Sequence, residues 1–258
     1  MSLQPQIFIS LGSFGASEVR RHGQNWFVHL CHDAGADGVE IRGELLTGGH
    51  DELLTLAASV RDLGMDCIYS SPAMLWDSQS RLATDHLEQG LLAATTLGAG
   101  VLKMSIGGFS ADQAADTLPH LAHRLAGQPV KLLIENDQTE SAGTLPALQR
   151  FFQRADQAGL NLGMTFDMGN WHWLGECSLQ ASAAFAGRVQ YVHCKGVQRQ
   201  PQRWVAVPLT DSAVPWRAVL RALPGNVPRA IEYPLVGEDL TNTTRAAVQQ
   251  LRVLEVVR

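Results

Sequence analysis

Cysteine is scarce in this sequence, and the few thiols are widely separated. The 258 residues contain four cysteines, none of them in a Cys-x-x-Cys pair: Cys31, Cys67, Cys177 and Cys194. Cysteine zinc sites and dithiol redox centres usually bring thiols close together in the sequence, and small secreted domains depend on dense disulfides. The spacing argues against all three classes and is typical of reduced thiols. We therefore expect a cytoplasmic protein.

Lysine is also rare, and positive charge is not concentrated anywhere. The chain has a formal net charge of −5, with three lysines among its 20 basic residues. Proteins that bind nucleic acid or anionic membranes usually show a basic stripe, which is absent here. No apolar run approaches the roughly 20 residues that cross a bilayer, and no basic-then-apolar leader is visible. We expect neither nucleic acid nor a membrane as a partner.

What the sequence does contain is a regular alternation of two patterns. Short apolar runs predict eight strands: Gln6–Leu11, Asp37–Gly43, Asp66–Ser71, Val101–Gly107, Lys131–Asn136, Leu162–Asp167, Val189–Gly196 and Arg229–Leu235. Segments rich in Ala, Leu, Gln and Arg between them predict helices, including Asp51–Leu63, Arg81–Leu97, Ala111–Leu125, Leu145–Ala158 and Asp239–Val256.

This alternation predicts an α/β fold, a (β/α)₈ TIM barrel formed by a single domain over residues 1–258. Eight strand–helix units match the typical barrel length of about 250 residues. No linker rich in Pro, Gly or Ser interrupts the series. A doubly wound open sheet is the alternative, but Leu11–Gly15 after the first strand is only a turn and not a glycine-rich dinucleotide loop.

Four successive predicted strands carry a polar residue near the carboxyl end, where the active sites of such barrels lie. These residues are Glu135, Asp167, His193 and Glu232. Each alternates with aliphatic neighbours, so in a closed barrel each should point inward. Three carboxylates and one imidazole would then converge on the barrel axis, and a divalent cation would remove the repulsion among the carboxylates.

The predicted donor set suits a hard divalent metal. Carboxylates with one imidazole accommodate Mn²⁺, our first expectation, and also Mg²⁺, Co²⁺ or Zn²⁺. A single strand-end carboxylate is usually a helix cap, and a single inward histidine is usually a satisfied core residue. One such residue on each of four consecutive strands is a pattern that these ordinary roles do not explain.

The motifs around these residues resemble those of the xylose-isomerase-like barrels, which include sugar isomerases and epimerases. They are Ile134-Glu135-Asn136, Phe166-Asp167-Met168-Gly169-Asn170, Val192-His193-Cys194-Lys195 and Ile231-Glu232-Tyr233-Pro234. The resemblance implies one divalent metal held by the four residues above, with Glu135 and Glu232 also forming the acid/base pair. It implies that Arg199, shortly after the metal-binding histidine, helps to hold the sugar. The ketose 3-epimerases of the family place a substrate-contacting histidine where this chain has Asn170, with His172 two residues later.

Further residues are candidates for substrate binding. Glu40 and Arg42 share one face of the second predicted strand, where they either reach the mouth of the barrel or form a closing ion pair. Lys103 also lies on a strand. Lys195 has the parity of His193, so it should point inward and could neutralise an oxyanion or a carboxylate of the substrate.

We therefore expect a divalent-metal-dependent isomerase or epimerase of a small sugar, sugar phosphate or sugar acid. Proton transfer would pass through a metal-stabilised ene-diolate. A dehydratase of the inosose or 3-dehydroshikimate type is the alternative, with Lys195 or His172 as the general acid. An apurinic-site endonuclease and a non-catalytic sugar or metal binder are lesser alternatives. A homo-oligomer remains open.

Overall fold

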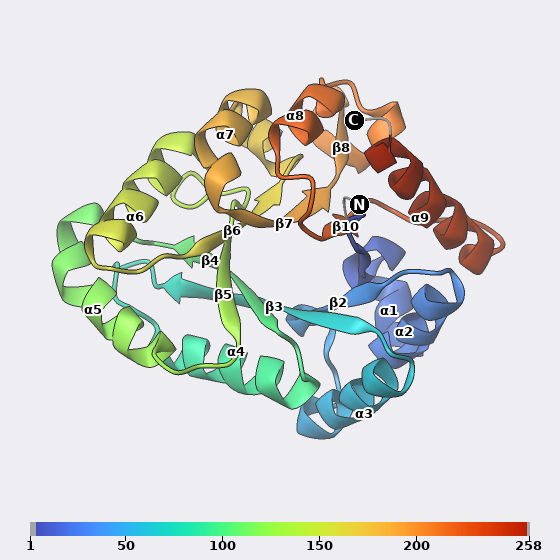
Figure 1. Ribbon diagram of the computed structural model, residues 1–258, viewed down its shortest axis with the longest axis horizontal. Helices are drawn as coiled ribbons and strands as arrows, with labels where there is room; N and C mark the ends of the chain where they lie inside the picture. The colour runs from blue at the N-terminus through green and yellow to red at the C-terminus, as the bar shows by residue number, and fades with distance from the viewer. Residues whose placement is uncertain (1–3, 257–258) are drawn as a thin grey trace.

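The computed structural model describes residues 4–256, and in this part of the chain parallel strands close into a barrel (Figure 1). The predicted (β/α)₈ barrel is thus confirmed, whereas a single domain over residues 1–258 stays a prediction. Around the barrel the strands follow the order β1-β10-β7-β6-β5-β4-β3-β2. Their bounds are β1 Ile7–Ser10, β2 Gly38–Arg42, β3 Asp66–Trp76, β4 Val101–Gly107, β5 Lys131–Glu135, β6 Gly163–Asp167, β7 Val189–Cys194 and β10 Arg229–Ile231.

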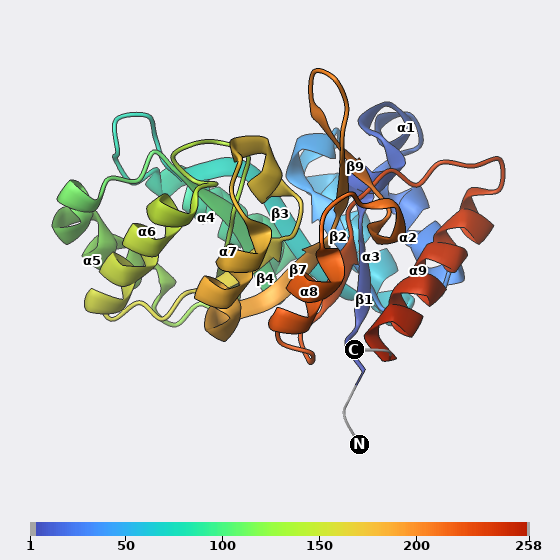
Figure 2. The same cartoon turned by 90° about the horizontal axis from the view of Figure 1, so that it is seen from above.

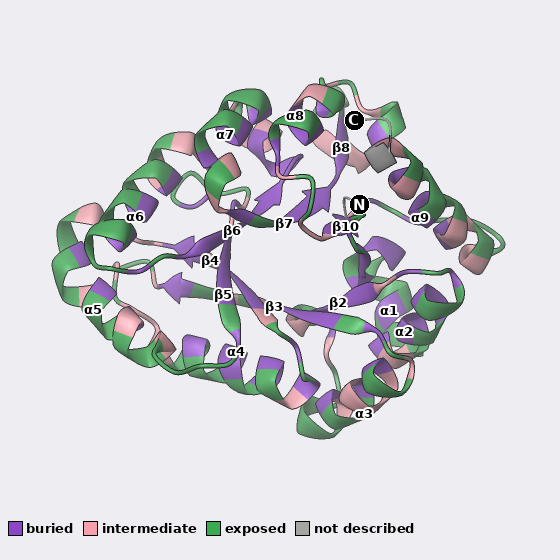
Figure 3. Cartoon of the chain, viewed as in Figure 1, coloured by how far each residue is buried: buried purple, intermediate pink, exposed green. Residues whose placement is uncertain are grey.

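Helices surround the barrel, and most of their exposed residues face outward while the strands are almost wholly buried (Figure 3). The predicted helices all occur, with ends shifted by up to three residues. The helices are α1 Ala16–His22, α2 Gln24–Asp33, α3 Gly49–Asp62, α4 Thr84–Leu97, α5 Ala114–Leu125, α6 Leu145–Gln157, α7 Ser178–Phe185, α8 Trp216–Ala222 and α9 Leu240–Val256. Between residues 4 and 256 no helix is both long and apolar enough to cross a membrane.

The lower part of the barrel interior is filled by an apolar plug. Its buried members come from five strands and are Phe8, Ile68, Leu133, Tyr191 and Ala230. Gly38 makes room for this plug, because a Cβ atom there would lie 2.3 Å from the Phe8 ring. Since side chains alternate along a strand, the next side chain to point inward lies two residues further on, and these side chains form the next layer. That layer is polar, and it contains the candidate site.

Two of the predicted strands end four or five residues away from their predicted ends, whereas the others end within two residues. The last one stops at Ile231 instead of Leu235, so Glu232 lies just beyond the ladder. The chain there bonds to the segment after β1 instead of to a strand: Ser13 Oγ donates to Ile231 O, and Leu235 N donates to Ser13 O. The third strand continues to Trp76, past the predicted end at Ser71, with a register shift after Ser70.

A two-stranded hairpin that we did not predict follows β7. Its strands β8 (Gly196–Arg199) and β9 (Trp204–Val207) pair antiparallel. The hairpin rises above the carboxyl ends of the barrel strands, on the side opposite the start of β1 (Figure 2). It therefore stands next to the end of the barrel where chemistry is expected.

Candidate metal centre

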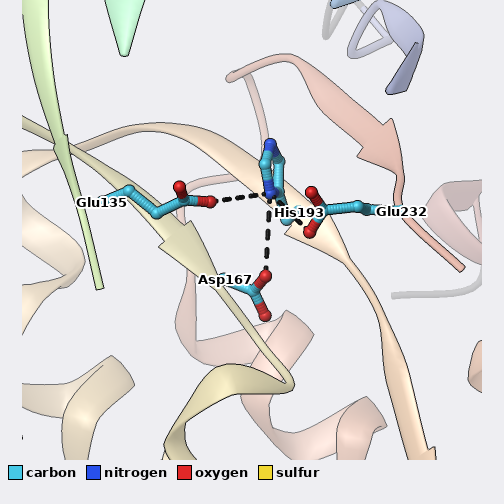
Figure 4. A group of neighbouring side chains, drawn as sticks. All are labelled: Glu135, Asp167, His193 and Glu232. Carbon is cyan, nitrogen blue, oxygen red and sulfur yellow. Dashed lines mark ion pairs between the residues drawn. The ribbon is translucent and has the colours of Figure 1, made fainter. Parts of the chain in front are cut away.

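The structure brings the four strand-end residues together. Each of Glu135, Asp167, His193 and Glu232 offers one possible ligand atom, and these atoms lie within 4.8 Å of one another. Nδ1 of His193 lies 3.0 Å from Glu135 Oε1, 2.9 Å from Glu232 Oε2 and 3.7 Å from Asp167 Oδ2. In Figure 4 the two glutamates approach this nitrogen from opposite sides, with Asp167 between them. Their roles as metal ligands stay a prediction.

Asp167 is fixed by a hydrogen-bonded clamp between β5 and β6. The side chain of Asn136, directly after β5, donates to Asp167 O at 3.0 Å and accepts from Asp167 N at 2.9 Å. Within the turn, Asp167 Oδ1 accepts from Gly169 N at 2.7 Å and Asn170 N at 2.9 Å. Since Oδ1 is thereby occupied, only Oδ2 is turned toward the centre of the barrel. We did not assign Asn136 a role, although it directly follows Glu135 at a strand end.

His193 is wholly buried, and both ring nitrogens face carboxylates. Nε2 lies 2.7 Å from Glu40 Oε2. The Tyr191 ring packs edge-to-face with the imidazole, with the centroids 5.2 Å apart. Nδ1 makes no hydrogen bond, because the oxygen atoms of Glu135 and Glu232 lie beside it in directions unsuited to one. A buried nitrogen surrounded by acceptors in this way is suited to a cation at their centre.

Two buried lysines supply positive charge to the ligand carboxylates. Lys103 Nζ lies 2.9 Å from Glu135 Oε2. Lys195 Nζ lies 2.6 Å from Asp167 Oδ2 and 2.8 Å from Glu232 Oε2. Lys195 therefore points into the barrel, as its position two residues after His193 predicted. Of the three lysines in the chain, these two belong to the site.

Arg42 joins the site to the second strand. Its Nη1 lies 3.0 Å from both Glu40 Oε1 and Glu232 Oε1, and its Nη2 lies 2.8 Å from Glu44 Oε1. We had expected Glu40 and Arg42 either to reach the mouth of the barrel or to form an ion pair. Arg42 does both, because it forms an ion pair with Glu40 and also lines the mouth of the barrel. Glu40 differs from Arg42 in being wholly buried.

These contacts shift the acidities of the carboxyl groups in different directions. Burial by itself raises the pKa of Glu232, but His193 and Lys195 outweigh it and hold that pKa well below its usual range. Burial raises the pKa of Asp167, with Lys195 acting in the opposite direction. Glu135 has a lowered pKa because Lys103 and His193 overcome the effect of burial. Glu135 and Glu232 are therefore ionised at neutral pH and can accept a metal or a proton.

A cavity of about 370 Å³ opens beside the centre. Its charged lining residues include Arg42, Lys195 and Glu232, and Gly12 and Ser13 border it after β1. We call this space the mouth cavity; its other lining residues are Ala16, Arg20, Glu44, Leu45, Ala206, Tyr233 and Pro234. We did not predict that Arg20, Glu44 and Ala206 line a cavity, because none of them lies in a recognisable sequence motif. The volume suits a small molecule, and the charged lining side chains favour polar groups on it.

Three residues expected to bind substrate lie elsewhere. Asn170 is buried, and its side chain donates to Asn136 O at 2.8 Å and accepts from Gln138 at 3.0 Å, so it is engaged in holding the turn. His172 packs its ring 5.4 Å from the ring of Trp204, and burial lowers its pKa. Arg199 is exposed on β8, with its guanidinium 5.7 Å from the Trp204 ring centroid. None of the three borders the mouth cavity.

The four residues fit one divalent metal. Ligand atoms about 2.1 Å from a common ion lie roughly 3–4 Å apart, close to the separations found here. Carboxylate oxygens with one imidazole suit Mn²⁺, Mg²⁺, Co²⁺ and Zn²⁺. The unpaired Nδ1 of His193 gives independent support, because a bound cation would satisfy it.

Comparison with known proteins gives the family. A sequence profile described as xylose isomerase-like TIM barrel matches residues 28–255. No sequence among the curated proteins gives a significant match.

Many solved structures share the fold. One is a probable 3-DHS dehydratase, AsbF, from Bacillus anthracis, with a TM-score of 0.72, 14% identity, and coverage of 95% of this chain and 98% of that chain. Another is a D-allulose 3-epimerase from Methylomonas sp. in complex with D-allulose, with a TM-score of 0.67, 13% identity and 97% coverage of each chain. A third is the IOLI protein with a zinc atom, with a TM-score of 0.68, 15% identity, and coverage of 98% of this chain and 97% of that chain. Identities this low establish the shared fold alone.

Proposed function

The chain belongs to the xylose isomerase-like TIM barrel family, and from this premise we propose that it is a divalent-metal-dependent isomerase or epimerase of a small sugar, sugar phosphate or sugar acid. The observation that carries the proposal is the placement of two carboxylates on opposite sides of one centre. Glu135 and Glu232 approach His193 Nδ1 at 3.0 and 2.9 Å from opposite sides (Figure 4). A binding protein has no need of two such groups, whereas proton transfer between the faces of one carbon requires them.

In the proposed reaction the two glutamates move the proton. One of Glu135 and Glu232 removes it from a carbon next to the carbonyl, and the other returns it. The glutamate that removes the proton must be ionised, and the one that returns it must be protonated. Lys103 beside Glu135 and Lys195 beside Glu232 stabilise the ionised form of each. A divalent cation, Mn²⁺ as our first choice, would supply charge stabilisation for the ene-diolate that forms.

Substrate would enter through the mouth cavity. Lys195 and Arg42 line it beside Glu232, so they present positive charge to the substrate oxygens next to the reacting carbon. Asp167 and His193 are wholly buried and serve only to hold the metal. The protein with D-allulose bound, which shares the fold, supports a polyhydroxylated substrate of similar size.

A dehydratase is the second candidate. It would use the same first proton removal, after which the glutamate that took up the proton returns it to a departing hydroxyl group, while the ammonium group of Lys195 at the cavity wall stabilises the charge that develops there. The engagement of Asn170 in the turn favours this alternative, because the family's epimerases have a substrate-contacting histidine there. The shared fold of the AsbF dehydratase is consistent with it.

The test is an activity screen in D₂O. Metal-stripped protein reloaded with Mn²⁺ is incubated with keto-sugars, their phosphates and polyhydroxy keto acids, and products are analysed by NMR and mass spectrometry. An epimerase or isomerase should place deuterium on one carbon next to the carbonyl, and a dehydratase should yield a product lighter by one water. Turnover without deuterium would point to hydride transfer and would refute the proposed roles of both glutamates.

Variants show whether the two glutamates carry the reaction. Glu135→Gln and Glu232→Gln keep the shape of the side chain but remove the basic carboxylate, so each should lower the rate at least about 10²-fold. Glu140→Gln is the matched control, because Glu140 is exposed in the loop after β5. Circular dichroism should be unchanged in all three. If both site variants keep nearly the parent rate, neither glutamate is the acid or the base.

A further inference from the structure

Among the described residues at the centre, Glu40 is an acidic side chain that lies behind the four proposed ligands instead of among them. It is wholly buried on β2, and it does not border the mouth cavity. The side chains of Glu135 and Glu232 keep 17% and 15% of their surface exposed, so Glu40 differs from the proposed acid and base in having none. We propose that Glu40 is a positioning residue that fixes the orientation of the His193 ring, so that Nδ1 presents its lone pair to the metal. This inference rests on the proposed function, because it presupposes a metal at the four ligands.

The argument begins with the two nitrogens of the ring. A neutral imidazole has one N–H donor and one acceptor nitrogen. An ionised carboxylate can only accept, so Oε2 of Glu40, 2.7 Å from Nε2, requires the hydrogen on that nitrogen. When a metal is bound, Nδ1 is then left with its lone pair for that ion, on the side of the ring where the oxygens of Glu135 and Glu232 lie. Carboxylates bonded in this way to the far nitrogen of a metal-binding histidine fix its tautomer and raise its basicity.

Glu40 can do this only if it is itself held still. Its other oxygen, Oε1, accepts from Ser10 Oγ at 3.2 Å and from Arg42 Nη1 at 3.0 Å, and it lies 3.3 Å from Lys103 Nζ. These three groups stand on β1, β2 and β4, so the carboxylate is anchored by rigid elements. Because all three act on Oε1, Oε2 remains for His193.

The same anchors connect Glu40 to the proposed acid and base. Lys103 lies between Glu40 and Glu135, and Arg42 lies between Glu40 and Glu232. A purely structural ion pair would need only these cations. The 2.7 Å contact with His193 Nε2 is the feature that such a role leaves unexplained.

The test uses Zn²⁺ as a diamagnetic probe and the full-length protein with ¹⁵N-labelled histidine. Two-bond ¹H–¹⁵N spectra report which ring nitrogen carries hydrogen, and the His193 signals are identified by their loss in His193→Gln. In the parent protein the hydrogen should be on Nε2. Glu40→Leu removes the acceptor, so it should weaken Zn²⁺ binding, measured by competition with a chelator, about 10–100-fold and alter the ring signals.

Two further variants keep the outcome clear. Glu40→Gln retains an acceptor oxygen without the charge, so Nε2–H should persist while affinity falls about tenfold, and this variant decides the matter if Glu40→Leu does not fold. Glu140→Gln changes an exposed glutamate outside the site, so it is the matched control and affinity should stay within about twofold of the parent. Parent-like affinity in a folded Glu40→Leu or Glu40→Gln variant, with unchanged ring signals, would overturn the role of Glu40 alone. If the parent binds no Zn²⁺, the proposed metal site fails and this inference fails with it.

Discussion

Metal binding should release about one proton from His193 at neutral pH. Burial alone lowers the pKa of His193, but the carboxylates of Glu232, Glu40 and Glu135 outweigh it and hold that pKa well above 6.5. At pH 7 the metal-free imidazole thus carries a hydrogen on both nitrogens, one facing Glu40 and one at Nδ1. Because a metal coordinates the lone pair of Nδ1, the second hydrogen must leave when the metal binds.

The magnitude follows from this exchange of one proton for one ion. Below the raised pKa, each unit of falling pH should weaken metal binding about tenfold, or about 1.4 kcal/mol. The contribution of His193 to the folding stability of the metal-free protein should change with pH in the opposite direction. A raised folded-state pKa contributes stability that is fully present below the unfolded value near 6.5 and is lost as the pH rises through the folded value. As pH increases above about 6.5, affinity should rise while the contribution of His193 to stability declines.

Isothermal titration calorimetry measures the released proton directly. Mn²⁺ is titrated into metal-free protein at several pH values between about 6.5 and 8, in buffers of different ionisation enthalpy. The pKa values of Lys103 and Lys195 are raised by their carboxylate partners, against the effect of burial, so neither lysine should contribute protons. Glu140→Gln should behave as the parent. A binding enthalpy that is the same in every buffer, with an affinity independent of pH, would refute the reasoning.

Three substitutions test the scaffold of the site by urea denaturation. Asn136→Ala leaves the buried N–H and C=O groups of Asp167 without partners, so it should cost about 2–3 kcal/mol; a loss under about 0.5 kcal/mol would contradict the clamp. Gly38→Ala should cost about 1–3 kcal/mol, since its Cβ would lie 2.3 Å from the Phe8 ring, and an unchanged midpoint would mean that the plug can yield. Lys103→Met leaves the carboxylates of Glu40 and Glu135 without their shared cation and should cost about 3–5 kcal/mol in metal-free protein, less once Mn²⁺ is added; parent-like stability would show that the cation is dispensable.

Much of the site could be predicted because the rules that place its residues act within short segments of the chain. Strand residues alternate between two faces, and the carboxyl ends of parallel strands in a barrel meet at one end. Glu135, Asp167 and His193 could therefore be placed on the same inner layer from their neighbours alone. Lys195 shares the parity of His193 and follows the same rule. Glu232 obeys it too, although it lies one residue beyond its strand.

Elements without such a pattern were missed for equally physical reasons. The β8–β9 hairpin consists of two four-residue strands, and its register is set by pairing with itself. It carries Arg199 to an exposed position that no spacing from His193 could reveal. Asn170 was judged by alignment with a family motif, whereas its bonds to Asn136 and Gln138 depend on how the turns after β5 and β6 meet.

By itself the sequence determined the barrel, the end at which its polar residues gather and the four candidate metal ligands, because strand periodicity and residue chemistry are properties of short segments. Only the tertiary structure decided what those donors touch. Glu40 and His193 are 153 residues apart, and their contact depends on closure of the barrel and on the register of every strand between them. Hydrogen bonds require placement within a few tenths of an ångström, which side-chain alternation does not specify. The same closure sets Lys103 between Glu40 and Glu135.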